Sequence, residues 1–250
     1  MGKEGRIYDS HTTLNYESTH NFFDNRALKY NENNPYSVTM YQDNNPELVK
    51  ERNRKEVECL LPFLELNEKS RVLDVACGIG RWSDAIKQDI EEYCGIDFGS
   101  GLIDIAKSRN KQKENRIFLS GNITNLNTIL RINNRGKYNR VLVIGGLVYL
   151  NDIDVKNVLS QIVANSDENS IICVREPIGI KQRLTLKEFY SSELNDSYNA
   201  IYRTKKELMM IFEECFMLAG FTLTKADFLF HEDSLNNREE TAQYYFIFKK

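Results

Sequence analysis

From Arg71 onward, short apolar and β-branched runs alternate with segments of helical periodicity. Five such runs follow one another, at residues 71–76, 93–97, 117–121, 140–146 and 170–176. Strands that alternate with helices along a chain are typical of a parallel sheet with crossover helices. Residues 221–230 and 243–249 then alternate as two further strands, which we expect to form a terminal hairpin. The pattern therefore predicts an α/β fold.

Helix signals accompany these strands. Asn45 followed by Pro46 is an N-cap and first-turn signature, and it predicts a helix that continues until Pro62 disturbs its last turn. Apolar residues at helical spacing predict another helix at 153–165. A capping box at 204–207 starts a further helix, which we expect to end at the glycine in position 220.

Residues 1–45 differ from the rest of the chain, because they are polar and aromatic with weak periodicity. We interpret them as a cap or lid over a domain that spans residues 46–250. No repeat or low-complexity segment divides that domain.

The chain of 250 residues has 41% hydrophobic side chains, enough for a substantial core, so a disordered or fibrous protein is excluded. The net charge of −3 provides no global positive field, which argues against a nucleic-acid or membrane partner. The N-terminus lacks the apolar stretch of a signal peptide. The near-apolar run at 141–150 is about half of the roughly 20 residues that a membrane helix needs, so we expect a cytoplasmic protein.

The five cysteines are widely spaced and contain no C-x-x-C pair. This pattern argues against a disulfide framework and against a structural zinc site. We therefore predict reduced thiols and no metal.

Residues that end the predicted strands carry the candidate chemistry, because ligands of open parallel sheets bind at the carboxyl ends of the strands. The first strand contains Asp74 and leads into Gly78 and Gly80, where glycines let the backbone approach a ligand. The second ends at Asp97, an acid suited to a ribose diol, beside the apolar Phe98. The third and fourth end in small and polar residues, at 121–123 and 145–147.

This ordered set resembles the class I S-adenosylmethionine-dependent methyltransferases over about residues 46–250. The shared features are an acid inside strand one, G-x-G after it, an acid ending strand two 17 residues past Gly80, and a polar residue ending strand three. The resemblance implies a Rossmann-like sheet of seven mostly parallel strands with an antiparallel C-terminal strand and helices on both faces. It also implies S-adenosylmethionine as the cofactor.

The resemblance further implies a role for each matching residue. The methionine part of the cofactor would contact Asp74 and the backbone of Ala76, Cys77, Gly78 and Gly80, with the Gly145 carbonyl near its amino group. The adenosine part would contact Asp97 through both ribose hydroxyls, and Phe98, Asn122 and Ile123 through the adenine. The sequence departs from the family at two of these positions, where Ala76 replaces the usual glycine and Asn122 the usual aspartate.

Two alternatives remain beside this interpretation. Asp97 also suits a nicotinamide-dependent oxidoreductase, but Ser83 occupies the third position of G-x-G-x-x-G, and that pattern has no use for Asp74. A catalytically silent module that binds cofactor is the second alternative.

The acceptor is expected to be a small molecule. The loop after the fourth strand, at 145–149, lacks the [N/D]-P-P-[Y/F] motif of base-methylating enzymes, and no basic domain is present. A hydroxyl acceptor would need a base, for which His20 is the best candidate among the three histidines. An anionic oxygen would instead need cations, for which we consider Arg203 with its neighbour Tyr202. Arg175 and Arg183, which flank the segment after the fifth strand, are further candidates.

The acceptor pocket is expected to be lined by Tyr41 and Tyr149. The cap is similar to the lids of methyltransferases that act in bacterial surface-polysaccharide pathways. This similarity implies O-methylation of a phosphoramidate, phosphorylated or sugar-nucleotide intermediate of capsule polysaccharide biosynthesis, and it leaves the oligomeric state open.

Overall fold

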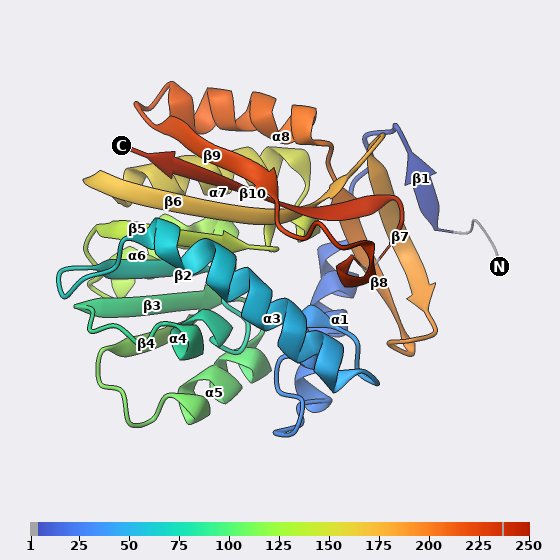
Figure 1. Ribbon diagram of the computed structural model, residues 1–250, viewed down its shortest axis with the longest axis horizontal. Coiled ribbons are helices and arrows are strands. Elements are labelled where there is room, and N and C mark those ends of the chain that lie inside the picture. Colours follow the sequence, from blue (N-terminus) through green and yellow to red (C-terminus); the bar gives the residue numbers. More distant parts are fainter. Residues whose placement is uncertain (1–4, 237) are drawn as a thin grey trace.

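The computed structural model describes residues 5–236 and 238–250, and a sheet of seven strands forms its centre (Figure 1). The strand order is β4-β3-β2-β5-β6-β10-β9. The strands are β2 (Arg71–Val75), β3 (Glu92–Asp97), β4 (Arg116–Ser120), β5 (Tyr138–Ile144), β6 (Ser166–Gly179), β9 (Thr222–Phe228) and β10 (Thr241–Lys249). Strands β2 to β6 pair in parallel, and β10 is antiparallel to both of its neighbours. The predicted Rossmann-like fold is confirmed.

The order of the strands reverses at the centre of this sheet. From β2 the chain moves outward to β3 and β4, and then returns to the other side of β2 with β5 and β6. In doubly wound sheets, a crevice opens at the carboxyl ends of the strands beside such a reversal.

Helices cover both faces of the sheet. They are α3 (Pro46–Leu60), α4 (Arg81–Ala85), α5 (Ser100–Arg109), α6 (Leu126–Ile132), α7 (Asp152–Ala164) and α8 (Lys205–Phe212), with single turns at η1 (Leu61–Leu64), η2 (Ile123–Asn125), η3 (Leu147–Tyr149), η4 (Glu213–Met217) and η5 (Asp233–Leu235). Apolar residues of α6, α7 and α8 pack with Leu73 and Val75, while those of α3, α4 and α5 pack with Val72 and Leu142. The central strands are therefore buried on both faces, which explains their continuous apolar runs.

A second sheet covers one end of the molecule, and the sequence pattern did not predict it. Its order is β1-β7-β8, with β1 (Arg6–Tyr8), β7 (Leu184–Ser191) and β8 (Asp196–Tyr202), and all pairs are antiparallel. Two helices, α1 (Tyr16–Leu28) and α2 (Ser37–Met40), lie between β1 and α3 along the chain. Residues 5–45 and the β7–β8 hairpin lie together at this end of the molecule, and we call these two segments the cap (Figure 1).

Arg203, which we considered as a cation for an anionic acceptor, does not line the pocket and is paired within the protein. It is 2% exposed, and its guanidinium donates to Asp152 Oδ1 at 2.8 Å and to the carbonyls of Leu147 at 3.0 Å and Leu150 at 2.6 Å. Arg183 reaches the same carboxylate at 3.0 Å. Because these partners occupy its donors and Arg203 does not line the pocket described below, its role is to connect β8 to α7.

Asp152 is the charged centre of this connection. Burial alone would raise its pKa, but Arg203, His11 and Arg183 outweigh burial and hold the pKa well below its usual range.

Among the described residues, no helix has the length and apolar character to cross a membrane.

We predict that Asp152→Asn lowers the free energy of unfolding by about 2 kcal/mol, because it leaves the buried Arg203 without its counter-charge. Because the folded pKa is depressed, the contribution of Asp152 is fully present above its unfolded pKa of about 4 and is lost as the pH falls below that value. Urea unfolding of both proteins between pH 3 and pH 7 measures this. A constant difference across that range would contradict the assignment.

Candidate active site

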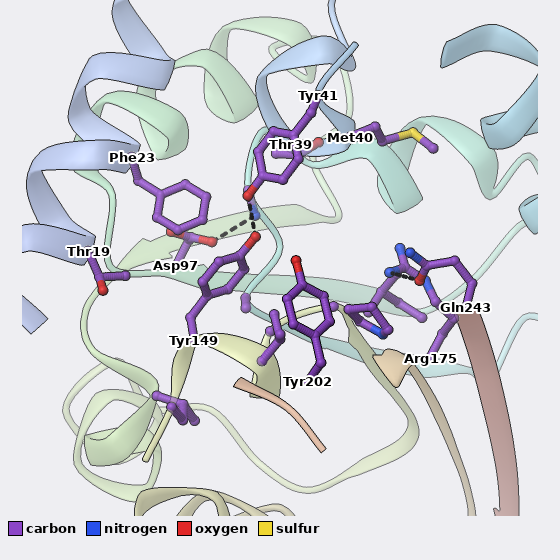
Figure 2. A pocket seen from close by; sticks show the side chains of 18 of the residues that line it. Thr19, Phe23, Thr39, Met40, Tyr41, Asp97, Tyr149, Arg175, Tyr202 and Gln243 are labelled. Carbon is purple, nitrogen blue, oxygen red and sulfur yellow. Dashed lines mark hydrogen bonds between the residues drawn. The ribbon is translucent and has the colours of Figure 1, made fainter. Parts of the chain in front are cut away.

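One pocket lies at the carboxyl ends of the central strands, beneath the cap. Figure 2 shows Asp97 with Phe23 and Thr19 on one side, the Arg175–Gln243 pair on the other, and Tyr41, Tyr149 and Tyr202 between them. We call these two parts the Asp97 end and the arginine end. Further residues of the wall include His20, Thr39, Ala76, Gly78, Phe98, Leu102, Asn122, Ile123, Gly145 and Gly146.

Asp97 is held rigidly where β3 ends. Its Oδ2 accepts a hydrogen bond from the Gly78 amide at 2.9 Å, and its Oδ1 accepts one from the Gly99 amide at 2.9 Å. Burial raises the pKa of Asp97, while these amides act in the opposite direction. The carboxylate is therefore fixed in the pocket wall.

The loop that follows β2 requires glycine at position 78. Gly78 has φ +54°, and a Cβ there would lie 2.6 Å from Thr39 Cγ2 in the cap. The side chain of Ala76, which replaces the usual glycine, lies opposite Gly146, where a Cβ would be 2.7 Å from the Ala76 Cβ. Both contacts show backbone segments that approach closely around the pocket.

Three residues predicted to contact cofactor lie outside the pocket wall. Asp74 is buried and accepts a hydrogen bond from the Tyr93 hydroxyl, and burial raises its pKa to about 7. Cys77 is also buried, and Gly80 precedes α4 with φ +74°. Cys77 belongs to the loop that carries Ala76 and Gly78, and Asp74 and Gly80 stand at its two ends, so we propose that these three residues support the loop.

Apolar side chains flank Asp97. Phe98, Leu102 and Ile123 line this end of the pocket, and the ring of His20 lies 4.2 Å from that of Phe98, measured between centroids. His20 is therefore at the Asp97 end, on the side opposite to the arginines. This placement argues against its predicted role as a base for the acceptor.

Three tyrosines occupy the middle of the pocket. The hydroxyls of Tyr41 and Tyr149 are hydrogen-bonded to each other, and the Tyr202 hydroxyl accepts a hydrogen bond from Arg238 at 3.3 Å. Burial raises the pKa of both Tyr41 and Tyr149. These hydroxyls therefore stay protonated at neutral pH and can donate hydrogen bonds.

Apart from Arg175, the functional candidates at the arginine end were missing from the predicted set. Glu56 on α3 is buried and binds Arg81 and, at 2.7 Å, Arg175. Burial opposes ionisation of Glu56, but the two guanidinium groups hold its pKa below the usual value. Arg52, Arg238 and Gln243 complete this wall. In sequence, the charged pattern of α3 resembles that of a solvated helix, so nothing local marked its buried face.

The residues of the Asp97 end fit S-adenosylmethionine. Asp97 offers a fixed carboxylate to a ribose diol, Phe98 and Ile123 offer apolar walls to the adenine, and Asn122 lies beside them. A Cβ at position 78, 145 or 146 would lie within 2.8 Å of Thr39, Arg175 or Ala76, so glycine lets these groups approach the backbone around the pocket. The fit therefore rests on the groups that line this end of the pocket in the protein itself.

Comparisons with known proteins agree with this fit. Residues 72–166 match the family model of a methyltransferase domain. No curated protein sequence matches the chain. The chain is similar to many solved structures, and the three described next, all at low identity, show the shared fold.

The N-methyltransferase NodS from Bradyrhizobium japonicum WM9, in complex with S-adenosyl-L-homocysteine, is 14% identical with a TM-score of 0.61, and the match covers 93% of this chain and 98% of that one. Magnesium protoporphyrin IX methyltransferase from Synechocystis PCC 6803, with bound S-adenosylmethionine, is 13% identical with a TM-score of 0.59 and coverage of 94% and 93%. Phosphoethanolamine N-methyltransferase 1 from Haemonchus contortus is 16% identical with a TM-score of 0.63, and the match covers 94% of this chain and 50% of that one.

We predict that Asp97→Asn weakens S-adenosylmethionine binding by about 1 to 3 kcal/mol, because a charge-assisted hydrogen bond becomes a neutral one. Calorimetric titration measures the dissociation constant. Asp104→Asn on α5, which changes an exposed acid, serves as the control and should bind as the unaltered protein does. If Asp97→Asn folds and binds equally well, Asp97 does not contact the cofactor.

The family model covers the strands that carry Asp97 and the loop glycines, and the pocket at their ends offers the groups that the cofactor needs. These findings support an enzyme with a methyltransferase domain over residues 72–166 and with S-adenosyl-L-methionine as its cofactor.

Proposed function

We propose that the protein transfers the methyl group of S-adenosylmethionine to an oxygen atom of a small molecule. The observation that carries this proposal is the continuity of the pocket, which joins the Asp97 end to an end lined by tyrosine hydroxyls and guanidinium groups. Phosphoramidate, phosphorylated and sugar-nucleotide intermediates of surface-polysaccharide synthesis are the acceptors that we would test first.

The cofactor supplies an electrophilic methyl group on a sulfonium, and its transfer is an in-line displacement. Much of the catalysis can therefore come from holding the acceptor in line at short distance. In this chain, Tyr41, Tyr149 and Tyr202 stand between the two ends of the pocket (Figure 2). Their hydroxyls are suited to orient the acceptor by donating hydrogen bonds.

The charge of the pocket favours oxygen over nitrogen as the methylated atom. Arg52, Arg175 and Arg238 line the arginine end and would repel a protonated amine, whereas Glu56 is already occupied by two guanidinium groups. The raised pKa values of Tyr41 and Tyr149 make them poor bases. An acceptor oxygen that is already anionic needs no base and suits this wall.

Among the similar structures, the enzyme from Haemonchus contortus is bound to phosphoethanolamine together with S-adenosylhomocysteine. That protein therefore binds a small phosphorylated molecule, and the match covers 50% of its chain. This supports the inclusion of phosphorylated acceptors here, although the low identity carries no residue from one site to the other.

Methyl transfer from labelled S-adenosylmethionine to a panel of phosphorylated, phosphoramidate and sugar-nucleotide compounds tests the proposal. The panel should include neutral alcohols and primary amines of similar size as controls. We expect transfer to an oxygen of one anionic class and none to the amines. Transfer to an amine alone, or to a polymeric nucleic acid, would contradict the proposal.

We predict that Tyr149→Phe lowers kcat/KM for methyl transfer by about tenfold to a hundredfold, because an orienting hydroxyl is lost. Its dissociation constant for S-adenosylmethionine should change by less than about twofold. Tyr190→Phe, which alters an exposed tyrosine on β7, is the matched control. Equal losses of cofactor affinity and of turnover would place Tyr149 in the cofactor site.

We propose also that the cap acts as a lid. The cap residues Thr39 and Tyr41 line the pocket, so ligands that fill the pocket should restrain α2 and its neighbours. S-adenosylhomocysteine together with an acceptor should slow amide exchange in residues 16–41, because closure excludes water and orders the backbone. Hydrogen exchange with mass spectrometry measures this protection, and unchanged exchange rates in residues 16–41 would contradict the proposal that the cap acts as a lid.

A further inference from the structure

Arg52 on α3 is a buried cation without a counter-charge among the described residues. It is 4% exposed, and its Nε has no hydrogen-bond partner. No ion pair joins Arg52 to any carboxylate among the side chains that the structure describes, and Glu193 acts on it only through longer-range attraction. Burial lowers the pKa of this guanidinium. Its side chain nevertheless lines the pocket.

A buried charge without a partner is costly, and proteins avoid it unless another group compensates the charge. Because Arg52 faces a pocket, a ligand that enters can supply the missing negative charge. An unpaired arginine in the wall of a cavity therefore indicates the charge of what the cavity binds.

The neighbours of Arg52 increase this excess of positive charge. Glu56, one turn along α3, is shared between Arg81 and Arg175, so one carboxylate serves two guanidinium groups. Arg175 also donates to Gln243 Oε1 at 3.1 Å, and its Nε is buried without a partner.

Arg238 approaches from the segment before β10. It donates to the hydroxyls of Tyr198 and Tyr202 and lies over the rings of both. Glu240 attracts it from a distance, but that carboxylate forms its ion pair with Arg6. Three arginines and one committed glutamate therefore line this end of the pocket.

We propose that Arg52, Arg175 and Arg238 form an oxyanion-binding subsite that holds a phosphate or carboxylate group of the methyl acceptor. Guanidinium groups bind both kinds of oxyanion through paired hydrogen bonds, which fix orientation as well as charge. The subsite lies beyond the three tyrosines from Asp97, so it holds the acceptor at the end opposite to the cofactor. This inference deepens the proposed function and rests on it for the identity of the anion as an acceptor group.

Thermal unfolding with added anions tests the subsite. Inorganic phosphate and acetate are added separately, at matched ionic strength, to the protein saturated with S-adenosylhomocysteine. The variant is Arg52→Met, and the control is Arg54→Met on the same helix, where Arg54 is exposed and pairs with Glu51 and Glu58. General salt effects on stability act on all three proteins alike and cancel in the comparison.

We expect at least one anion to raise the Tm of the unaltered protein and of Arg54→Met, but not that of Arg52→Met. Without anion, Arg52→Met should have a higher Tm than the unaltered protein, because an uncompensated buried charge is gone. Arg52→Lys keeps the charge and should retain part of the shift. A shift with phosphate alone supports a phosphate group on the acceptor, and a shift with acetate alone supports a carboxylate.

Equal anion shifts in Arg52→Met and the unaltered protein, or no shift with either anion, would overturn the subsite. The affinity for S-adenosylhomocysteine, measured by calorimetry, should be the same in all variants, since none of them alters the Asp97 end. If the protein binds no S-adenosylhomocysteine but still shows an Arg52-dependent anion shift, the subsite stands and the proposed function fails.

Discussion

The Asp97 carboxylate, buried at the end of β3 and held by the amides of Gly78 and Gly99, is the constraint around which the site is built. A buried carboxylate must have its oxygens satisfied, and here two loops converge to do so. Gly78, which donates to Asp97, has φ +54° and no Cβ, so Thr39 of the cap can approach it closely. The residue that satisfies this charge is therefore also one against which the cap packs.

Whether a buried charge has a partner also distinguishes Arg203 from Arg52. Arg203 is buried, but Asp152 and two carbonyls satisfy it, so it connects β8 to α7. Arg52 is equally buried and lacks such partners among the described residues. A compensated arginine stabilises the fold, whereas an uncompensated one beside a cavity favours binding of an anion.

The central sheet, and the site residues that follow its strands, could be predicted from the sequence. Each central strand is buried on both faces and is followed by a helix, so its apolar run can be recognised locally. The pairing of β1 with β7 could not be predicted, because these strands are far apart in the sequence and no local pattern records such pairing. Likewise, Asp97 and Gly78 were found from their positions at strand ends. Arg52 was missed and Arg203 misplaced because burial and pairing of an arginine are set by residues distant in sequence.

The central claim is that the ends of β2, β3 and β5 hold the cofactor at Asp97 and leave the arginine end to the acceptor. A crystal structure of the complex with S-adenosylhomocysteine tests this most directly. We expect the ribose hydroxyls within hydrogen-bond distance of Asp97, the adenine beside Phe98 and Ile123, and the sulfur directed towards Tyr149. Binding of S-adenosylhomocysteine at the arginine end, or outside this pocket, would contradict the account.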